Sequence, residues 1–251
     1  MPLLGEPHHD EMVKTLRAIA KKIPKPSAIL VISAHWETNV PTVTSGISPG
    51  LIYDYSGFPK QAYEIEYPAP GEPALATSVV NSLKLSGIEA AKDNVRGFDH
   101  GLFVPLKIMY PEANIPCVQL SLVNTLAPAL HIDIGNALQQ VQWDNLLVIG
   151  SGFSFHNMRA FFAPDSKEAR KNNLAFDDWL NDTVSDPTLP ESIREERLAQ
   201  WISAPGARYC HPREEHLLPL HVCYGLAGNP SDETFRAKIL QKQASMFHWS
   251  L

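Results

Sequence analysis

Three short apolar runs constrain the fold more than any other feature of the sequence. AILVIS, PCVQLSL and LLVIGS, at residues 28–33, 116–122 and 146–151, are rich in β-branched residues and nearly free of charge. Continuous apolar runs of this length are typical of strands buried on both faces, as in parallel sheets. Helix-like segments separate and flank the runs. This alternation predicts an α/β fold, a single domain over residues 1–251 with a central, mostly parallel sheet and helices on both faces.

The remaining segments fill in this plan. The spacing of apolar residues predicts helices at residues 9–22, 73–85, 128–141 and 214–226, and one that ends at Tyr110. We expect a short strand near 89–92, a turn at 96–101, two polar helices within 167–201, a loop at 204–213 and one strand in the tail. Residues 46–73 are dense in Gly, Pro, Tyr and Ser and predict a long loop over one face. Loops this long in a compact domain are usually functional.

Composition excludes several classes of protein. The formal net charge is -6, and no basic cluster could follow a phosphate backbone, so we expect no nucleic-acid partner. The three cysteines show no C-x-x-C spacing, which indicates free thiols in a reducing compartment. No apolar run approaches the roughly 20 residues of a membrane span, and the N-terminus lacks a signal-peptide pattern. We therefore expect a cytoplasmic protein with no membrane partner.

Four of the ten histidines stand out by their sequence context, two of them where a parallel sheet would gather its functional groups. His35 follows the first apolar run and His156 follows the third, so both are expected at the carboxyl ends of strands, where ligands bind in such sheets. His100 lies in a Gly-flanked turn, and His216 opens a predicted helix next to Glu215. Imidazole serves either as a metal ligand or as a proton carrier. Two histidines and a carboxylate also form the face used by non-haem Fe(II) oxygenases.

The other six histidines lack these contexts. We expect His8 and His9 to be solvated, and we expect no direct role for His131, His211, His221 and His248. Cys210 and His211 with His216 could form a zinc site, but the C-x-x-C element of such sites is missing. The GSGFS segment after the third run lacks the nucleophile elbow of serine hydrolases and the Lys-Ser/Thr of a phosphate loop.

Short motifs along nearly the whole chain resemble class III extradiol dioxygenases, in the branch similar to DOPA 4,5-dioxygenase. The motifs are Ser33–Trp36, Tyr55–Pro59, Tyr67–Gly71, Gly97–Gly101, Tyr110-Pro111, Pro116–Ser121, Ser151-Gly152 with His156-Asn157, and Glu215-His216 with Pro219-Leu220. Their order and distances carry the resemblance. It implies an aromatic ring-opening dioxygenase that acts on a catechol and O2 with Fe(II), while zinc is possible in the same site.

The resemblance also implies roles for particular residues. His35 and His216 would be metal ligands, with Glu215 as the alternative carboxylate. His156 would either act as the acid/base or bind the metal, and His100 would be a substrate-facing proton carrier. General acid–base help of this kind is worth roughly 10²–10⁴-fold in rate.

Aromatic residues of the long loop could form the wall of a substrate pocket. Tyr55 and Phe58 are the candidate substrate-binding residues, together with Tyr53 and Tyr63. Packing of the loop onto the core is an equally good interpretation of these four residues. A homodimer is a further possible partner arrangement.

Two alternatives stay open, and one departure from the family stands out. The chain could be a zinc-dependent hydrolase on the same scaffold, which would use metal-bound water and no oxygen. It could also be an inactive metal- or ligand-binding homologue.

In the family, a first strand ends in a His-Gly turn whose histidine is a ligand, whereas residues 1–7 resemble the stretch after that turn. We therefore expect this chain to be without one strand and one ligand.

Overall fold

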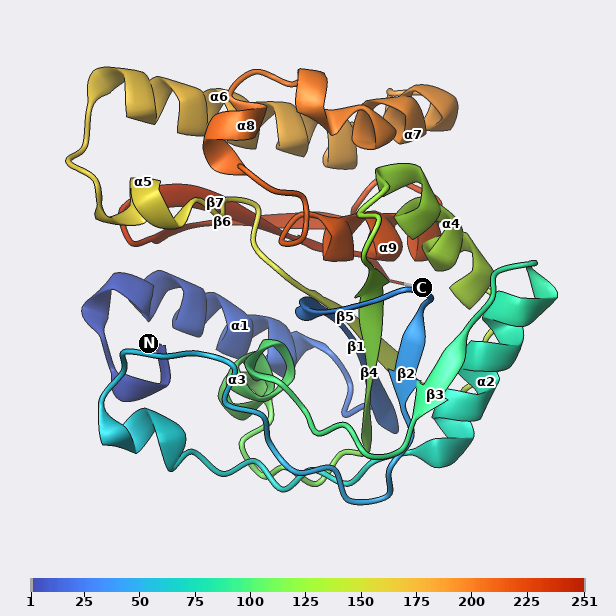
Figure 1. The fold of residues 1–251 in the computed structure, drawn as a ribbon. Helices are drawn as coiled ribbons and strands as arrows, with labels where there is room; N and C mark the ends of the chain where they lie inside the picture. The colour runs from blue at the N-terminus through green and yellow to red at the C-terminus, as the bar shows by residue number, and fades with distance from the viewer. Residues whose placement is uncertain (1, 251) are drawn as a thin grey trace.

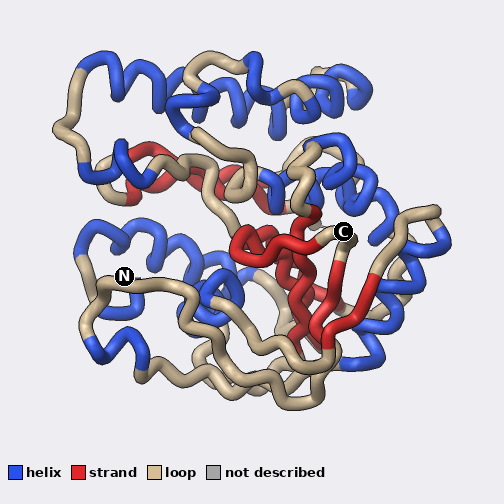
Figure 2. The backbone as a smooth tube through the Cα atoms, viewed as in Figure 1, coloured by secondary structure: helices blue, strands red, loops and turns tan. Residues whose placement is uncertain are grey.

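A five-stranded sheet forms the centre of the protein, as seen in a computed structural model that describes residues 2–250. The strands are β1 (Ala28–Thr38), β2 (Thr42–Thr44), β3 (Ala91–Asp93), β4 (Cys117–Val123) and β5 (Leu146–Ser151), in the order β3-β2-β4-β1-β5. β1 pairs in parallel with β4 and β5, and β2 pairs in parallel with β3, whereas β2 and β4 are antiparallel. The predicted α/β class with a mostly parallel sheet is confirmed (Figures 1 and 2).

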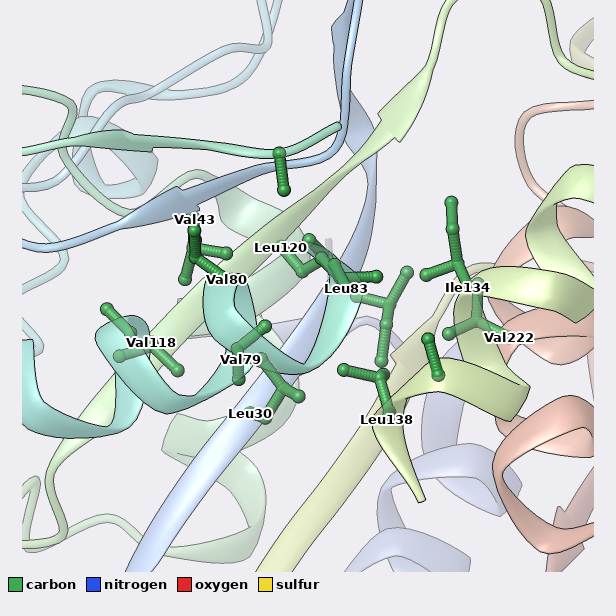
Figure 3. Packing of buried hydrophobic residues seen from close by; sticks show 14 of the residues in the cluster. Leu30, Val43, Val79, Val80, Leu83, Val118, Leu120, Ile134, Leu138 and Val222 are labelled. Atoms are coloured by element: carbon green, nitrogen blue, oxygen red, sulfur yellow. The ribbon is translucent and has the colours of Figure 1, made fainter. Parts of the chain in front are cut away.

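Helices cover both faces of the sheet because its central strands are apolar on both sides. Leu30 of β1 points into a cluster formed with α2 (Pro73–Leu85), α4 (Pro128–Leu138) and α9 (Leu218–Ala227) (Figure 3). Its neighbour Ile29 points the other way, toward α1 (Asp10–Lys22) and α3 (His100–Met109). This alternation follows from the two-residue repeat of a strand. β1 and β4 are therefore packed on both faces, and the groups at the edge of the sheet are carried by strands that lie between two hydrophobic clusters.

A second layer lies above the carboxyl ends of the strands. It contains α5 (Met158–Phe162), α6 (Lys167–Ser185), α7 (Glu191–Ala199), α8 (Ala207–Cys210) and the antiparallel hairpin of β6 (Glu233–Ile239) with β7 (Lys242–His248). β6 contacts α1 and β7 contacts α6, so the hairpin lies between these two helices (Figure 1). Phe176, Leu180, Trp201 and their neighbours fill the core of this layer.

Several predicted boundaries were wrong. β1 continues past Ser33 after an irregularity in its pairing with β4, so His35 lies inside the strand and not after it. α3 begins at His100 itself, because Asp99 accepts a hydrogen bond from the Gly101 amide and caps the helix. α9 begins at Leu218, so His216 lies in the turn before the helix and does not open it.

The tail and two short elements also differ from expectation. The tail forms a hairpin of two strands where one strand was expected. The turn of the hairpin has positive φ at Leu240 and Gln241. Glycine or asparagine usually takes such positions, so these two residues give no signal of a turn in the sequence. The three-residue strand β2 was not predicted, and α8 lies inside the predicted loop at residues 204–213. His9, expected to be solvated, is buried. No helix within residues 2–250 is long and apolar enough to cross a membrane.

Candidate metal centre

The four histidines singled out in the sequence lie together at the carboxyl ends of β1 and β5. Their rings form a row in the order His100, His35, His216 and His156. The ring centroids are 3.8 Å apart for His100 and His35, 4.9 Å for His35 and His216, and 3.3 Å for His216 and His156. The sheet therefore brings together residues that are up to 181 positions apart, from His35 to His216.

Tight backbone packing sets the His100–His35 half of the row. Ser33 donates to Asp99 Oδ1 at 2.8 Å, and the Gly101 amide donates to the same oxygen at 3.0 Å. A Cβ atom on Gly101 would lie 2.5 Å from Ser33 Oγ and 3.2 Å from His35 Cδ2. Because glycine has no side chain, the first turn of α3 can approach the strand closely enough for the two imidazoles to touch.

Backbone hydrogen bonds position the other half of the row, His216 and His156. The Phe153 amide donates to the His216 carbonyl at 2.9 Å, and the His156 amide donates to the Cys210 carbonyl at 2.9 Å. A Cβ atom on Gly152 would lie 2.2 Å from the His216 carbonyl oxygen. The segment after β5 therefore packs directly against the turn that carries His216, which explains how two histidines 60 residues apart can stack.

A carboxylate closes the row at each end. Glu215 Oε1 lies 3.0 Å from His216 Nδ1 and 3.6 Å from His156 Nδ1. At the opposite end Asp54 Oδ1 accepts from His100 Nδ1 at 2.7 Å, and Asp54 Oδ2 lies 3.7 Å from His35 Nδ1. Sequence reasoning found Glu215 but missed Asp54, whose only signal was its position between two tyrosines on the long loop.

Burial makes the two central histidines neutral. Burial first, and then the nearby His100, lower the pKa of His35 from 6.5 to about 4. Burial also lowers the pKa of His216 to about 4, although its hydrogen bond with Glu215 acts in the opposite direction. A neutral imidazole has a lone pair on one ring nitrogen, which is the state that a metal ligand needs.

The two carboxylates remain charged. Burial alone would raise the pKa of Glu215, but hydrogen bonds from His156 and His216 outweigh it and hold that pKa well below its usual value. Burial would likewise raise the pKa of Asp54, but its hydrogen bonds with His100 lower it overall. Each end of the row therefore carries a negative charge that can stabilise a cation.

The donor set suits a divalent metal ion. His35, Asp54 and His100 form one group whose donor atoms lie within 4.8 Å of one another, and His156, Glu215 and His216 form another. Imidazole and carboxylate ligands are those of zinc and non-haem iron. Glu215 Oε2 is buried without a hydrogen-bond partner among the described residues, and it lies 3.4 Å from Arg213 Nη1. A buried carboxylate oxygen left in this way is consistent with a bound ion.

The aromatic residues of the long loop border the row on its His100 side. The Tyr55 ring lies 5.4 Å from the His100 ring, and the Phe58 ring lies 5.5 Å from Tyr55 and is 38% exposed. The Tyr55 hydroxyl donates to the Ala62 carbonyl at 2.5 Å, so Tyr55 also packs the loop on itself. The geometry fits both interpretations of these aromatic residues, the wall of a substrate pocket and the packing of the loop.

Three of the remaining histidines are buried structural groups that are not part of the row. His131 accepts a hydrogen bond from the Val123 amide through Nε2 and donates to the Ala127 carbonyl through Nδ1. His211 and His221 also contact backbone carbonyls and are fully buried. In His131 both ring nitrogens are used by the backbone, which ties the end of β4 to α4.

We expect replacement of His131 by glutamine to reduce the acid sensitivity of the fold. Burial lowers the pKa of His131 to about 4, against 6.5 for the exposed group, so the unfolded chain binds the proton first and stability falls as the pH falls between these values. From about pH 7.5 to about pH 5, His131 contributes about 2 kcal/mol of this loss. Urea unfolding at both pH values measures it. For each protein, the free energy of unfolding at the lower pH is compared with its own value at the higher pH, so a constant loss from missing hydrogen bonds cancels. The same pH dependence in the variant and the unaltered protein would contradict the role of His131.

Comparison with known proteins identifies one family and several relatives that are named as dioxygenases. Residues 3–250 match the family described as the catalytic LigB subunit of aromatic ring-opening dioxygenase. Dioxygenase tasH of Hapsidospora irregularis is 37% identical over 90% of this chain and 74% of its own length. The 4,5-DOPA dioxygenase extradiol of Beta vulgaris is 41% identical over 82% of this chain and 75% of its own length.

A bacterial relative and a solved structure extend the likeness. The 4,5-DOPA dioxygenase extradiol of Escherichia coli is 32% identical over 84% of this chain and 77% of its own length. The crystal structure of an uncharacterised Escherichia coli K12 protein superposes with a TM-score of 0.73 at 27% identity, over 94% of this chain and 91% of that one. Sequence and fold are thus similar over nearly the whole chain.

Proposed function

Because the chain belongs to the LigB family of aromatic ring-opening dioxygenases, we propose that it opens a catechol-type ring next to the diol at a divalent metal ion held by His35 and His216. The extradiol ring-cleavage class is shared with its relatives. The observation that carries the assignment to this site is the row of four imidazoles with a carboxylate at each end.

Glu215 supports the choice of His216 as a ligand. Glu215 Oε1 lies 3.0 Å from His216 Nδ1, whereas Asp54 Oδ2 lies 3.7 Å from His35 Nδ1, which is beyond hydrogen-bond distance. In the His216 ring Nε2 is then the nitrogen available to a metal. A carboxylate behind the metal-binding histidine is a recurrent arrangement, because it fixes the ring and makes the nitrogen a stronger ligand. In this proposal Glu215 orients His216, and it and His156 are the residues that could complete the ligand set.

Two histidines remain to move protons. When bound, an Fe(II) ion, or zinc in the same site, would lower the pKa of the diol and bring it next to O2. His100 and His156 flank the proposed ligands on opposite sides, so each can accept or return a proton at one side of a bound ring. Asp54 and Glu215 are close enough to stabilise the protonated form of each.

The surrounding residues would orient the substrate. Tyr55 and Phe58 present an aromatic edge beside His100 that suits a planar ring. The second layer over the strand ends would limit the access of water to the site. The same proposal includes three further expectations. Residues 1–251 form one domain, the protein is cytoplasmic, and it can form a homodimer. That the chain is without one strand and one ligand of the family stays a prediction.

Oxygen uptake with a panel of catechols tests the proposal. Protein purified without oxygen and loaded with Fe(II) should consume O2 with at least one catechol and form a yellow ring-opened product. Parallel samples loaded with zinc, or treated with a chelator, control for metal dependence. Catechol-independent hydrolysis without O2 uptake would support the zinc hydrolase instead and contradict this function.

A further inference from the structure

Asp54 is held against His100 by the loop that carries it. The Ile52 amide donates to the Phe98 carbonyl at 2.8 Å, and the Phe98 amide donates to the Gly50 carbonyl at 2.8 Å. The loop is thus bonded to the segment immediately before His100. Farther along, the Tyr53 hydroxyl donates to the Ile65 carbonyl at 2.6 Å. The stretch of loop that leads into Asp54 is therefore bonded to the segment that leads into His100.

One oxygen of Asp54 receives both hydrogen bonds from His100. Asp54 Oδ1 accepts from the ring nitrogen Nδ1 at 2.7 Å and from the His100 amide at 3.1 Å. The side chains of Asp54 and His100 are only 22% and 26% exposed. A carboxylate can only accept, so Nδ1 must carry the hydrogen, and in the neutral imidazole Nε2 then carries the lone pair.

From this geometry we propose that Asp54 is a positioning residue that fixes the ring orientation and the Nδ1–H tautomer of His100, so that Nε2 can accept a proton from the substrate. The inference rests on the proposed function, in which His100 is one of the two proton carriers. It gives the long loop a definite part in the site beyond its aromatic edge.

The same contacts argue against Asp54 as a metal ligand. Both of its bonds to His100 use Oδ1, and Oδ2 lies at 3.7 Å from His35 Nδ1. If Asp54 turned toward an ion, the His100 amide and ring would both lose their acceptor. Leaving such donors without a partner costs about 1–3 kcal/mol each.

Substitution of Asp54 gives a direct kinetic test. We expect Asp54→Ala to lower kcat about 10–100-fold, the usual cost of losing a residue that orients a functional histidine, with little change in KM or metal content. Asp54→Asn should recover most of kcat, because the His100 amide keeps the amide oxygen turned toward His100. Glu64→Ala is the matched control, since Glu64 lies on the same loop and its ion pair is with Lys60.

Two further readouts separate positioning from other roles. In the background of His100→Ala, Asp54→Ala should cause no additional loss, because residues that act as one unit are not additive. Imidazole nitrogen-15 NMR should show His100 with its hydrogen on Nδ1 in the unaltered protein and with that preference lost in Asp54→Ala. The NMR readout needs no turnover, so it decides the proposal even if the unaltered protein opens no ring.

Distinct outcomes would overturn each idea. Full additivity of the two substitutions, an unchanged His100 tautomer in Asp54→Ala, or loss of metal from that variant would each overturn the positioning role. If the Fe(II)-loaded unaltered protein opened no catechol, the proposed function would fail while the tautomer experiment still decided the role of Asp54.

Discussion

Replacing His216 by alanine should remove metal and ring cleavage together. His216 is 7% exposed, lies between His35 and His156, and has Glu215 fixed on its Nδ1 side. Loss of its other nitrogen would leave the proposed ion with one histidine fewer. A metal ion contributes several kcal/mol to the stabilisation of charge, and about 1.4 kcal/mol is tenfold in rate, so kcat/KM should fall by at least about a thousandfold.

Metal content and activity should be measured on the same preparation. His8→Ala is the control, because His8 is exposed and far from the row in sequence. Circular dichroism and thermal unfolding check that the variant folds. A folded His216→Ala protein that retained stoichiometric metal would exclude His216 as a ligand, and His156 with Glu215 would become the better candidate pair.

The sheet could be predicted from sequence because its signals are local. The runs at residues 116–122 and 146–151 correspond closely to β4 and β5, and residues 73–85 form α2 as predicted. Each of these elements has one hydrophobic pattern along its whole length, so local spacing and burial agree. That His35 and His156 would lie on the same edge of the sheet also followed from the general behaviour of parallel sheets.

The details of the site could not be predicted in the same way. β1 continues through His35 because β4 offers a second set of partners beyond the irregularity at Ser33, and that pairing is not visible in the sequence of β1. Asp54 becomes important only because the loop is bonded to the segment before His100. A lone acidic residue in a loop has no distinguishing pattern, so only the folded chain reveals its partner.

His156 presents a choice between two roles that the structure sharpens. Its ring stacks on His216 at 3.3 Å, and its Nδ1 lies 3.6 Å from the buried carboxylate of Glu215. Those contacts would suit a ligand next to His216. They would equally suit a base whose protonated form Glu215 stabilises, which is the role that we propose.

We expect His156→Ala to lower kcat by about 10²–10⁴-fold, the range for loss of a general acid–base group, while metal content stays at the level of the unaltered protein. Met158→Ala is the matched control, because Met158 lies two positions later and is 55% exposed. Iron content, O2 uptake and the rate of product formation should be followed in parallel. A drop in metal that matches the drop in activity would make His156 a ligand, and the proton transfer would then fall to His100 with Asp54 behind it.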